Sequence, residues 1–186
     1  LEAYKDANYL KGGLVYADWI TTVSPTYAEE IKMPFYGEGL DGLMRARSGQ
    51  LSGILNGIDY DEYNPETDPA LPEKYNAIDF RKRKVKNKLA LQEELGLEKN
   101  EHKFMIGLVS RLTDQKGLDL VAYMMDQICS EDVQLVVLGT GDAKYENMFR
   151  HFAWKYPDRV SANIFYSDER SHRIYGACDA FLMPSL

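Results

Sequence analysis

Apolar and polar residues alternate along the chain with the periods of helices and buried strands. The first 58 residues predict, in order, a helix over 8–19 with Leu10, Leu14 and Ala17 on one face, a strand over 20–24, a helix from residue 25, a glycine-rich turn over 36–42 before a short helix, and a strand over 51–57. Ser24 is the predicted cap of the second helix because Pro25 follows it at the first helical position. This alternation is typical of a layered α/β domain.

The segment 59–78 breaks the pattern. It contains three prolines and many acidic residues, and it shows no hydrophobic periodicity. A linker or a long surface loop is expected here. The pattern then predicts a strong helix over 79–97 that ends at Gly96.

Three strand–turn–helix units follow, over residues 103–129, 133–155 and 160–176, with a final strand over 180–184. The strands "FMIGLV", "QLVVLG" and "AFLMP" are continuous apolar runs, as expected for strands buried on both faces of a parallel sheet. We therefore expect three parts: an α/β piece over 1–58, a crossing segment over 59–78, and a second α/β piece over 79–186. Both α/β pieces are expected to be incomplete.

Charge and cysteine content narrow the classes of function. A net charge of −7 argues against non-specific binding to nucleic acid or to an anionic membrane. No apolar run approaches the roughly 18 residues of a membrane span. Cys129 and Cys178 are far apart and form no C-x-x-C motif, so neither a disulfide framework nor a zinc site is indicated. This cysteine usage suits a reducing cytoplasm.

The turn "SRLTDQKG" (110–117) contains two cations that its geometry does not require. Arg111 and Lys116 stand between a strand and a helix start, where positive charge opposes the helix dipole unless an anion lies nearby. They could pair with an acid: Asp114, Asp119 or Glu131. They could also clamp a diphosphate, with a guanidinium fork, a point charge and the free N–H groups of the helix start. The spacing is not that of a P-loop.

Two further turns fall at the carboxyl ends of predicted strands, where parallel sheets bind ligands. "GTGD" (139–142) lacks a third Rossmann glycine, because residue 144 is Lys, so a tight turn competes with a nucleotide contact. Tyr166 is either a half-buried core residue or a ring on which a base stacks.

The basic run (residues 81–88) favours a solvated helix face over a nucleic-acid site, because Asp79 precedes Arg83 by four residues and Glu93 and Glu94 follow. The histidines are scattered, so no metal site is expected. "KGGL" (11–14) lies inside a helical pattern and is interpreted as helix surface.

Taken together, these stretches resemble bacterial glycogen synthase and plant starch synthase, which are retaining glycosyltransferases of the two-domain GT-B fold. The resemblance rests on "ADWITTVSPTYAEEI", "LNGID", "NPETD", "SRLTDQKGLDL", "LGTGD" and "SHRIYGACDAFLMPS". It implies two Rossmann-like domains with parallel sheets, and a parent enzyme that transfers glucose from ADP-glucose to the non-reducing end of an α-1,4-glucan. It implies no cofactor and no metal. Two alternatives stay open: a sucrose synthase-like enzyme that uses UDP-glucose, and a non-catalytic nucleotide-binding segment.

The resemblance also assigns roles to individual residues. Arg111 and Lys116 match the pair that contacts the diphosphate and offsets charge on the departing ADP. The other matched positions are nucleotide or nucleotide-sugar contacts: Asn56, Gly139, Gly141, Asp142 and, at the adenine, Tyr166.

Some family features do not match. The family's donor loop does not align with "KGGL", and its catalytic histidine and acidic E-P-C-G motif fall outside these 186 residues. Family members often have Trp where this chain has Tyr63, which we interpret as a minor change in the linker. The resemblance thus implies an internal segment. On its own it is expected to be inactive and to self-associate through exposed sheet edges.

Overall fold

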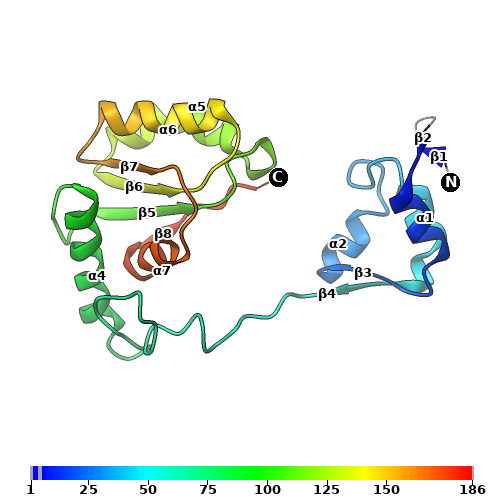
Figure 1. Ribbon diagram of the computed structural model, residues 1–186, viewed down its shortest axis with the longest axis horizontal. Coiled ribbons are helices and arrows are strands. Elements are labelled where there is room, and N and C mark those ends of the chain that lie inside the picture. Colours follow the sequence, from blue (N-terminus) through cyan, green and yellow to red (C-terminus); the bar gives the residue numbers. More distant parts are fainter. Residues whose placement is uncertain (1, 4–5, 186) are drawn as a thin grey trace. The chain divides into compact units, whose positions relative to one another are not determined.

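The computed structural model describes residues 2–3 and 6–185, which form two compact units, Leu1–Asp59 and Tyr60–Leu186 (Figure 1). The first unit contains, in order, β1 (Glu2–Ala3), β2 (Asp6–Ala7), α1 (Tyr9–Tyr16), β3 (Ile20–Val23), α2 (Pro25–Glu30), α3 (Asp41–Ala46), a 3-10 turn (Ser48–Gln50) and β4 (Leu51–Ile54). β1 and β2 are antiparallel, whereas β3 and β4 form a parallel pair. The predicted cap is confirmed, because the Ser24 side chain accepts a hydrogen bond from the backbone N–H of Tyr27 at 3.1 Å.

Helix α1 ends three residues earlier than its pattern predicts. Ala17 lies beyond the helix in an extended conformation, and Leu10 is exposed, so the predicted apolar face is wrong. The physical reason is Arg47, whose guanidinium donates to the backbone oxygens of Leu14, Val15 and Ala17 at 2.8, 2.7 and 2.5 Å. These bonds satisfy carbonyls that a longer helix would use internally. The "KGGL" stretch lies within α1, as predicted.

The second unit is a parallel α/β sandwich. It contains α4 (Phe80–Leu95), β5 (Phe104–Val109), a 3-10 turn (Asp114–Lys116), α5 (Leu118–Ser130), β6 (Val133–Leu138), α6 (Ala143–Lys155), β7 (Val160–Asn163), α7 (Asp168–Ala177) and β8 (Ala180–Phe181). The strand order is β7-β6-β5-β8, and every pair is parallel. This confirms the parallel sheet that the apolar runs predict, although β8 is shorter than the predicted 180–184.

Helices cover both faces of this sheet. α5 and α6 lie on one face and α7 on the other, with α4 packed against α7 (Figure 1). The first face buries a cluster that includes Leu118, Met125 and Phe149, and the second buries a cluster that includes Leu91 and Ile174. Burial on both faces explains why the strands are continuously apolar. Within the part of the chain that the structure describes, no helix is long and apolar enough to cross a membrane.

Helix α4 carries the basic run and ends at Gly96, as predicted, with Gly96 in the left-handed conformation at φ 69°. The expected pair between Asp79 and Arg83 is present, with Oδ2 and Nε 3.0 Å apart. The solvated-face interpretation is wrong for Lys88, which is buried. Its ammonium forms an ion pair with Asp179 at 2.6 Å and donates to two backbone oxygens, because a buried charge requires partners.

Candidate functional site

Three turns meet at the carboxyl edge of the sheet in the second unit. The backbone N–H of Leu112 donates to Thr140 O at 2.8 Å, and that of Asp142 donates to Leu112 O at 2.8 Å. The N–H of Gly139 donates to Asn163 O at 3.0 Å. These bonds continue the sheet beyond β5, β6 and β7, so the turns after the three strands form one connected edge.

Two glycines make this close approach possible. A Cβ at Gly139 would lie 1.9 Å from the carbonyl oxygen of Ser110, and a Cβ at Gly141 would lie 2.3 Å from that of Leu112. The N–H of Gly141 is already taken, because it donates to Glu146 Oε1 at 3.0 Å. These contacts account for both glycines through backbone packing, which is the tight-turn interpretation. Gly139 nevertheless also borders a hollow at this edge of the sheet.

A hollow of about 270 Å³ opens at this edge. Its lining comes from the ends of β5 and β6, the loop between β7 and α7, helix α7 itself, and Tyr63. Arg111 borders this hollow and also a second one of about 200 Å³, which Lys116 and residues 182–185 line. Arg111 therefore stands between an aromatic-walled hollow and a hollow that holds the second cation.

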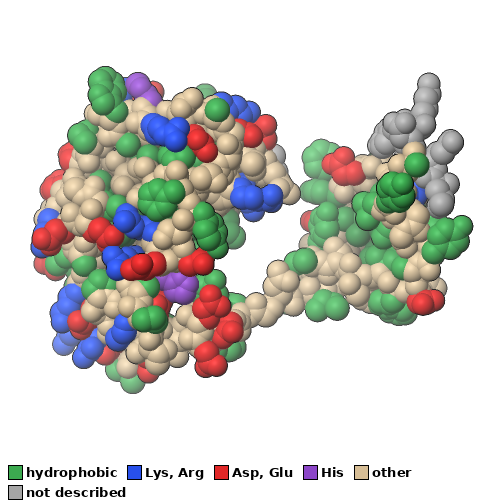
Figure 2. Space-filling view, in the orientation of Figure 1, with side chains coloured by type: hydrophobic (Ala, Val, Ile, Leu, Met, Phe, Trp, Pro, Cys, Tyr) green, Lys and Arg blue, Asp and Glu red, His purple; other side chains and the backbone are tan. Residues whose placement is uncertain are grey.

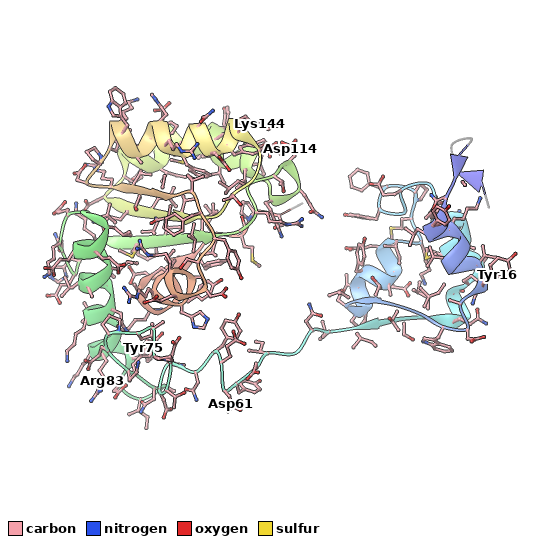
Figure 3. All side chains as sticks on the ribbon, in the orientation of Figure 1. Tyr16, Asp61, Tyr75, Arg83, Asp114 and Lys144 are labelled. Carbon is pink, nitrogen blue, oxygen red and sulfur yellow. The ribbon has the colours of Figure 1, made fainter. Side chains whose placement is uncertain are left out.

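Neither cation of this turn pairs with an acid in the described residues. The Arg111 guanidinium lies 3.5 Å from Gln115 Oε1, and the Lys116 ammonium has no side-chain partner among residues 2–3 and 6–185. Asp114 is engaged elsewhere: it accepts from Lys144 at 2.7 Å and from the Tyr145 hydroxyl (Figure 3). These hydrogen bonds, chiefly the one from Lys144, hold the pKa of the Asp114 carboxyl below its usual value. The two cations are thus open to an external anion.

The turn ends in a glycine that starts α5. Gly117 has φ 65°, and a Cβ there would lie 2.0 Å from the carbonyl oxygen of Pro184. Only glycine accommodates both the left-handed backbone and this contact. Lys116 is thereby fixed directly before the N-terminus of α5, where the positive end of the helix dipole adds to its own charge.

Tyr166 lines the aromatic hollow and is 83% exposed, which excludes the core interpretation. Its hydroxyl donates to Asp168 Oδ1 at 2.7 Å, and this bond raises the pKa of the phenol. The hydrogen bond fixes one edge of the ring and leaves its faces accessible. Such a ring can stack on an aromatic ligand.

The other predicted site residues do not line the aromatic hollow. Gly141 and Asp142 do not line the hollow; Asp142 precedes α6 without making a side-chain cap. Asn56 belongs to the first unit, where it follows β4 and is exposed. The structure thus gathers Arg111, Gly139 and Tyr166 around one hollow, with Lys116 at the adjoining one.

Two tyrosines that line the hollow were not singled out from the sequence. Tyr63 comes from the irregular segment, and Tyr175 lies near the C-terminal end of α7, where burial raises the pKa of its phenol. Tyr175 could be found from the helical period of α7, which turns it toward the sheet edge. Tyr63 has no comparable local signal, because the segment 59–78 has no periodicity.

Two protein-family models match parts of this chain. Residues 1–46 match the family described as the starch synthase catalytic domain. Residues 92–186 match the family described as glycosyl transferases group 1.

Curated relatives are similar along the whole chain. A glycogen synthase of Lachnospira eligens is 77% identical over 186 residues, covering 100% of this chain and 39% of the relative. A glycogen synthase of Thermotoga maritima is 55% identical over 185 residues, covering 100% of this chain and 38% of the relative. The chain therefore spans less than half the length of these relatives.

Solved structures share the fold. The catalytic domain of starch synthase IV from Arabidopsis thaliana, bound to ADP and acarbose, matches with a TM-score of 0.86 and 34% identity, over 95% of this chain and 36% of that one. HepE of Anabaena, in complex with UDP and glucose, matches with a TM-score of 0.57 and 18% identity, over 95% of this chain and 40% of that one, and this likeness concerns the fold alone. The fold is α/β of the GT-B type, of which these residues form a part. With more than half of its residues matched, the chain belongs to the glycosyl transferases group 1 family.

Proposed function

We propose that the protein containing this chain is a glycogen synthase, a retaining hexosyltransferase that moves glucose from ADP-glucose to the non-reducing end of an α-1,4-glucan. The observation that carries the proposal is the pair of open cations, Arg111 and Lys116, beside an aromatic-walled hollow at the carboxyl edge of the sheet. The high identity to glycogen synthases supports the choice of reaction. We assign this activity to the whole protein, acting in the cytoplasm.

The two cations suit the chemistry of the departing nucleotide. When the bond between glucose and diphosphate breaks, positive charge develops on the sugar while negative charge grows on the phosphate oxygens. Cations that are already in place stabilise this growing charge more than they stabilise the bound donor, so they lower the barrier. Arg111 offers a planar fork of donors and Lys116 a point charge at a helix N-terminus.

The aromatic hollow suits the nucleoside. We place the base against the Tyr166 ring, with the diphosphate reaching Arg111 and Lys116 past Gly139. In this proposal Gly141 and Asp142 belong to the same turn as Gly139 and maintain its backbone conformation. Asn56 is retained as a nucleotide-sugar contact on the strength of the resemblance alone. The structure of starch synthase IV bound to ADP supports a nucleoside diphosphate as the class of ligand.

The donor is the part of the proposal that is most directly tested. The full-length enzyme should be assayed for release of nucleoside diphosphate and for incorporation of glucose into glycogen, with ADP-glucose and UDP-glucose in parallel. We expect ADP-glucose to give the higher kcat/KM. Preferred turnover of UDP-glucose would favour a sucrose synthase-like transferase. ADP binding without transfer from either donor would favour a non-catalytic nucleotide-binding protein.

A further inference from the structure

The irregular segment that opens the second unit is docked onto α7 by specific contacts. Leu71 is buried, and its Cδ2 lies 2.4 Å from where a Cβ of residue 176 would be, so Leu71 packs closely over Gly176. The Arg173 guanidinium donates to Ala70 O at 3.2 Å. These contacts fix the segment against the helix whose first turns line the aromatic hollow.

A buried side-chain contact between His172 and Asp68 completes this docking. Nδ1 of His172 and Oδ2 of Asp68 are 2.6 Å apart, and their side chains are only 12% and 8% exposed. The second oxygen of Asp68 accepts from the backbone N–H of Ala70 at 2.8 Å. Both carboxylate oxygens are therefore occupied, and the imidazole of His172 is held in one orientation.

Tyr63 rests on this imidazole. The two rings are stacked, with centroids 5.0 Å apart and an interplanar angle of 21°. His172 thus covers one face of the tyrosine, yet Tyr63 remains 51% exposed and lines the same hollow as Tyr166. Tyr63 therefore has ring surface that His172 does not cover, and Tyr63 contributes to the lining of the hollow.

We propose that Tyr63 is a second nucleoside-contacting ring of this hollow, and that the Asp68–His172 pair is the positioning device that holds it there. The inference rests on the proposed function, because it takes the ligand of the hollow to be a nucleoside diphosphate. Aromatic rings recognise a base through its π-face, and two rings from different parts of the chain restrict the base more than one ring does. The competing explanation is that Tyr63 only packs on His172 to hold the docked segment against α7 and makes no contact with a ligand.

Calorimetric titration of the full-length protein with ADP separates the two explanations. Tyr63→Ala should raise the Kd for ADP about five- to tenfold, the low end for loss of one base–aromatic stack. Tyr63→Trp keeps a flat ring and should remain within about twofold of the wild type. Tyr60→Ala is the matched control, because Tyr60 lies three residues away, is 79% exposed and does not line the hollow. An unchanged Kd for Tyr63→Ala would overturn the inference.

The positioning role predicts non-additive effects. His172→Ala should raise the Kd for ADP about threefold to fivefold, but should cause no further change when Tyr63 is already Ala, because His172 acts through that ring. Asp68→Asn keeps the size of the side chain and serves where His172→Ala unfolds, as judged from the melting temperature. Full additivity of the two substitutions would overturn the positioning role. Failure of the wild-type protein to bind ADP would instead overturn the proposed function.

Discussion

Two groups of cations in the second unit differ both in their density along the sequence and in what surrounds them. On α4, Arg83 and Lys86 form ion pairs with Glu73, at 3.3 and 3.1 Å, and Lys88 pairs with Asp179. On the turn between β5 and α5, Arg111 and Lys116 pair with no acid among the described residues.

The surroundings explain the difference. Lys and Arg side chains lie intermixed with Asp and Glu over α4 and the segment docked beside it (Figure 2). At the sheet edge, the nearest acid in sequence, Asp114, is held by Lys144 (Figure 3). Arg83, Lys86 and Lys88 are therefore paired with acids of their own unit, whereas Arg111 and Lys116 retain their charge for a ligand. A count of cations does not locate an anion site; the partners of those cations do.

The largest effect is expected at the open cations. In the full-length enzyme, Arg111→Ala or Lys116→Ala should lower kcat/KM by about 2–4 kcal/mol of transition-state stabilisation, or roughly 30- to 1000-fold. Steady-state rates with ADP-glucose and glycogen provide the measurement. Arg83→Ala and Lys86→Ala are the matched controls and should leave kcat/KM within about twofold. Near-normal turnover of either turn variant would remove that residue from the proposed clamp.

For the free energy of unfolding, we expect the larger effect at the paired cations of α4. Lys88→Ala should lower the free energy of unfolding by about 2–3 kcal/mol, because the Asp179 carboxylate loses its cation and keeps, among the described residues, only the hydrogen bond from the Met105 N–H. The loss is smaller than for a fully buried pair. The side chain of Asp179 is 31% exposed, which allows water to compensate in part. Arg83→Ala, at a pair exposed to solvent, should cost about 0.5 kcal/mol. Denaturant unfolding measures both, and equal losses would contradict the distinction between the two pairs.

The fold was predictable where its determinants are local. Continuous apolar strands and helices with a 3.6-residue period specified the parallel sheet, because each element is encoded within its own residues. The end of α1 was not predictable, since the Arg47 guanidinium that terminates it lies about 30 residues away. The burial of Lys88 was not predictable for the same reason, because its partner Asp179 is distant in sequence.

The candidate site divides in the same way. Arg111 and Lys116 could be singled out because a strand, a turn and a helix start lie within one short stretch. Tyr63 could not, because its position depends on Asp68 and His172, which are 104 residues apart. Side chains that reach a site through long-range contacts leave no periodic signal in the sequence.

A smaller effect is expected at the aromatic hollow. Tyr166→Ala should weaken ADP binding by about 1–3 kcal/mol, the range for loss of one stacked ring. Tyr123→Ala is the control, because Tyr123 is similarly exposed, at 87%, but lies on α5 away from the hollow. Calorimetry that finds unchanged ADP affinity in folded Tyr166→Ala would leave the cations as the main nucleotide contacts and would contradict the base-stacking role.

The smallest effect concerns the acid that Lys144 holds away from the open cations. The pKa of the Asp114 carboxyl lies below its usual 3.8, first because of the hydrogen bond from Lys144 and then because of that from Tyr145. A depressed folded-state pKa stabilises the protein above the unfolded-state pKa, and the contribution disappears as pH falls through the folded-state value. Asp114→Asn should therefore lower Tm slightly at neutral pH, and the difference from wild type should shrink as pH falls below 3.8 and through the folded-state pKa. Lys144→Met, a control that removes the same contact from the other side, should lower Tm by a similar amount at neutral pH, and the double variant should add nothing. A Tm difference that persists unchanged at acid pH would show that Asp114 stabilises the turn without its charge.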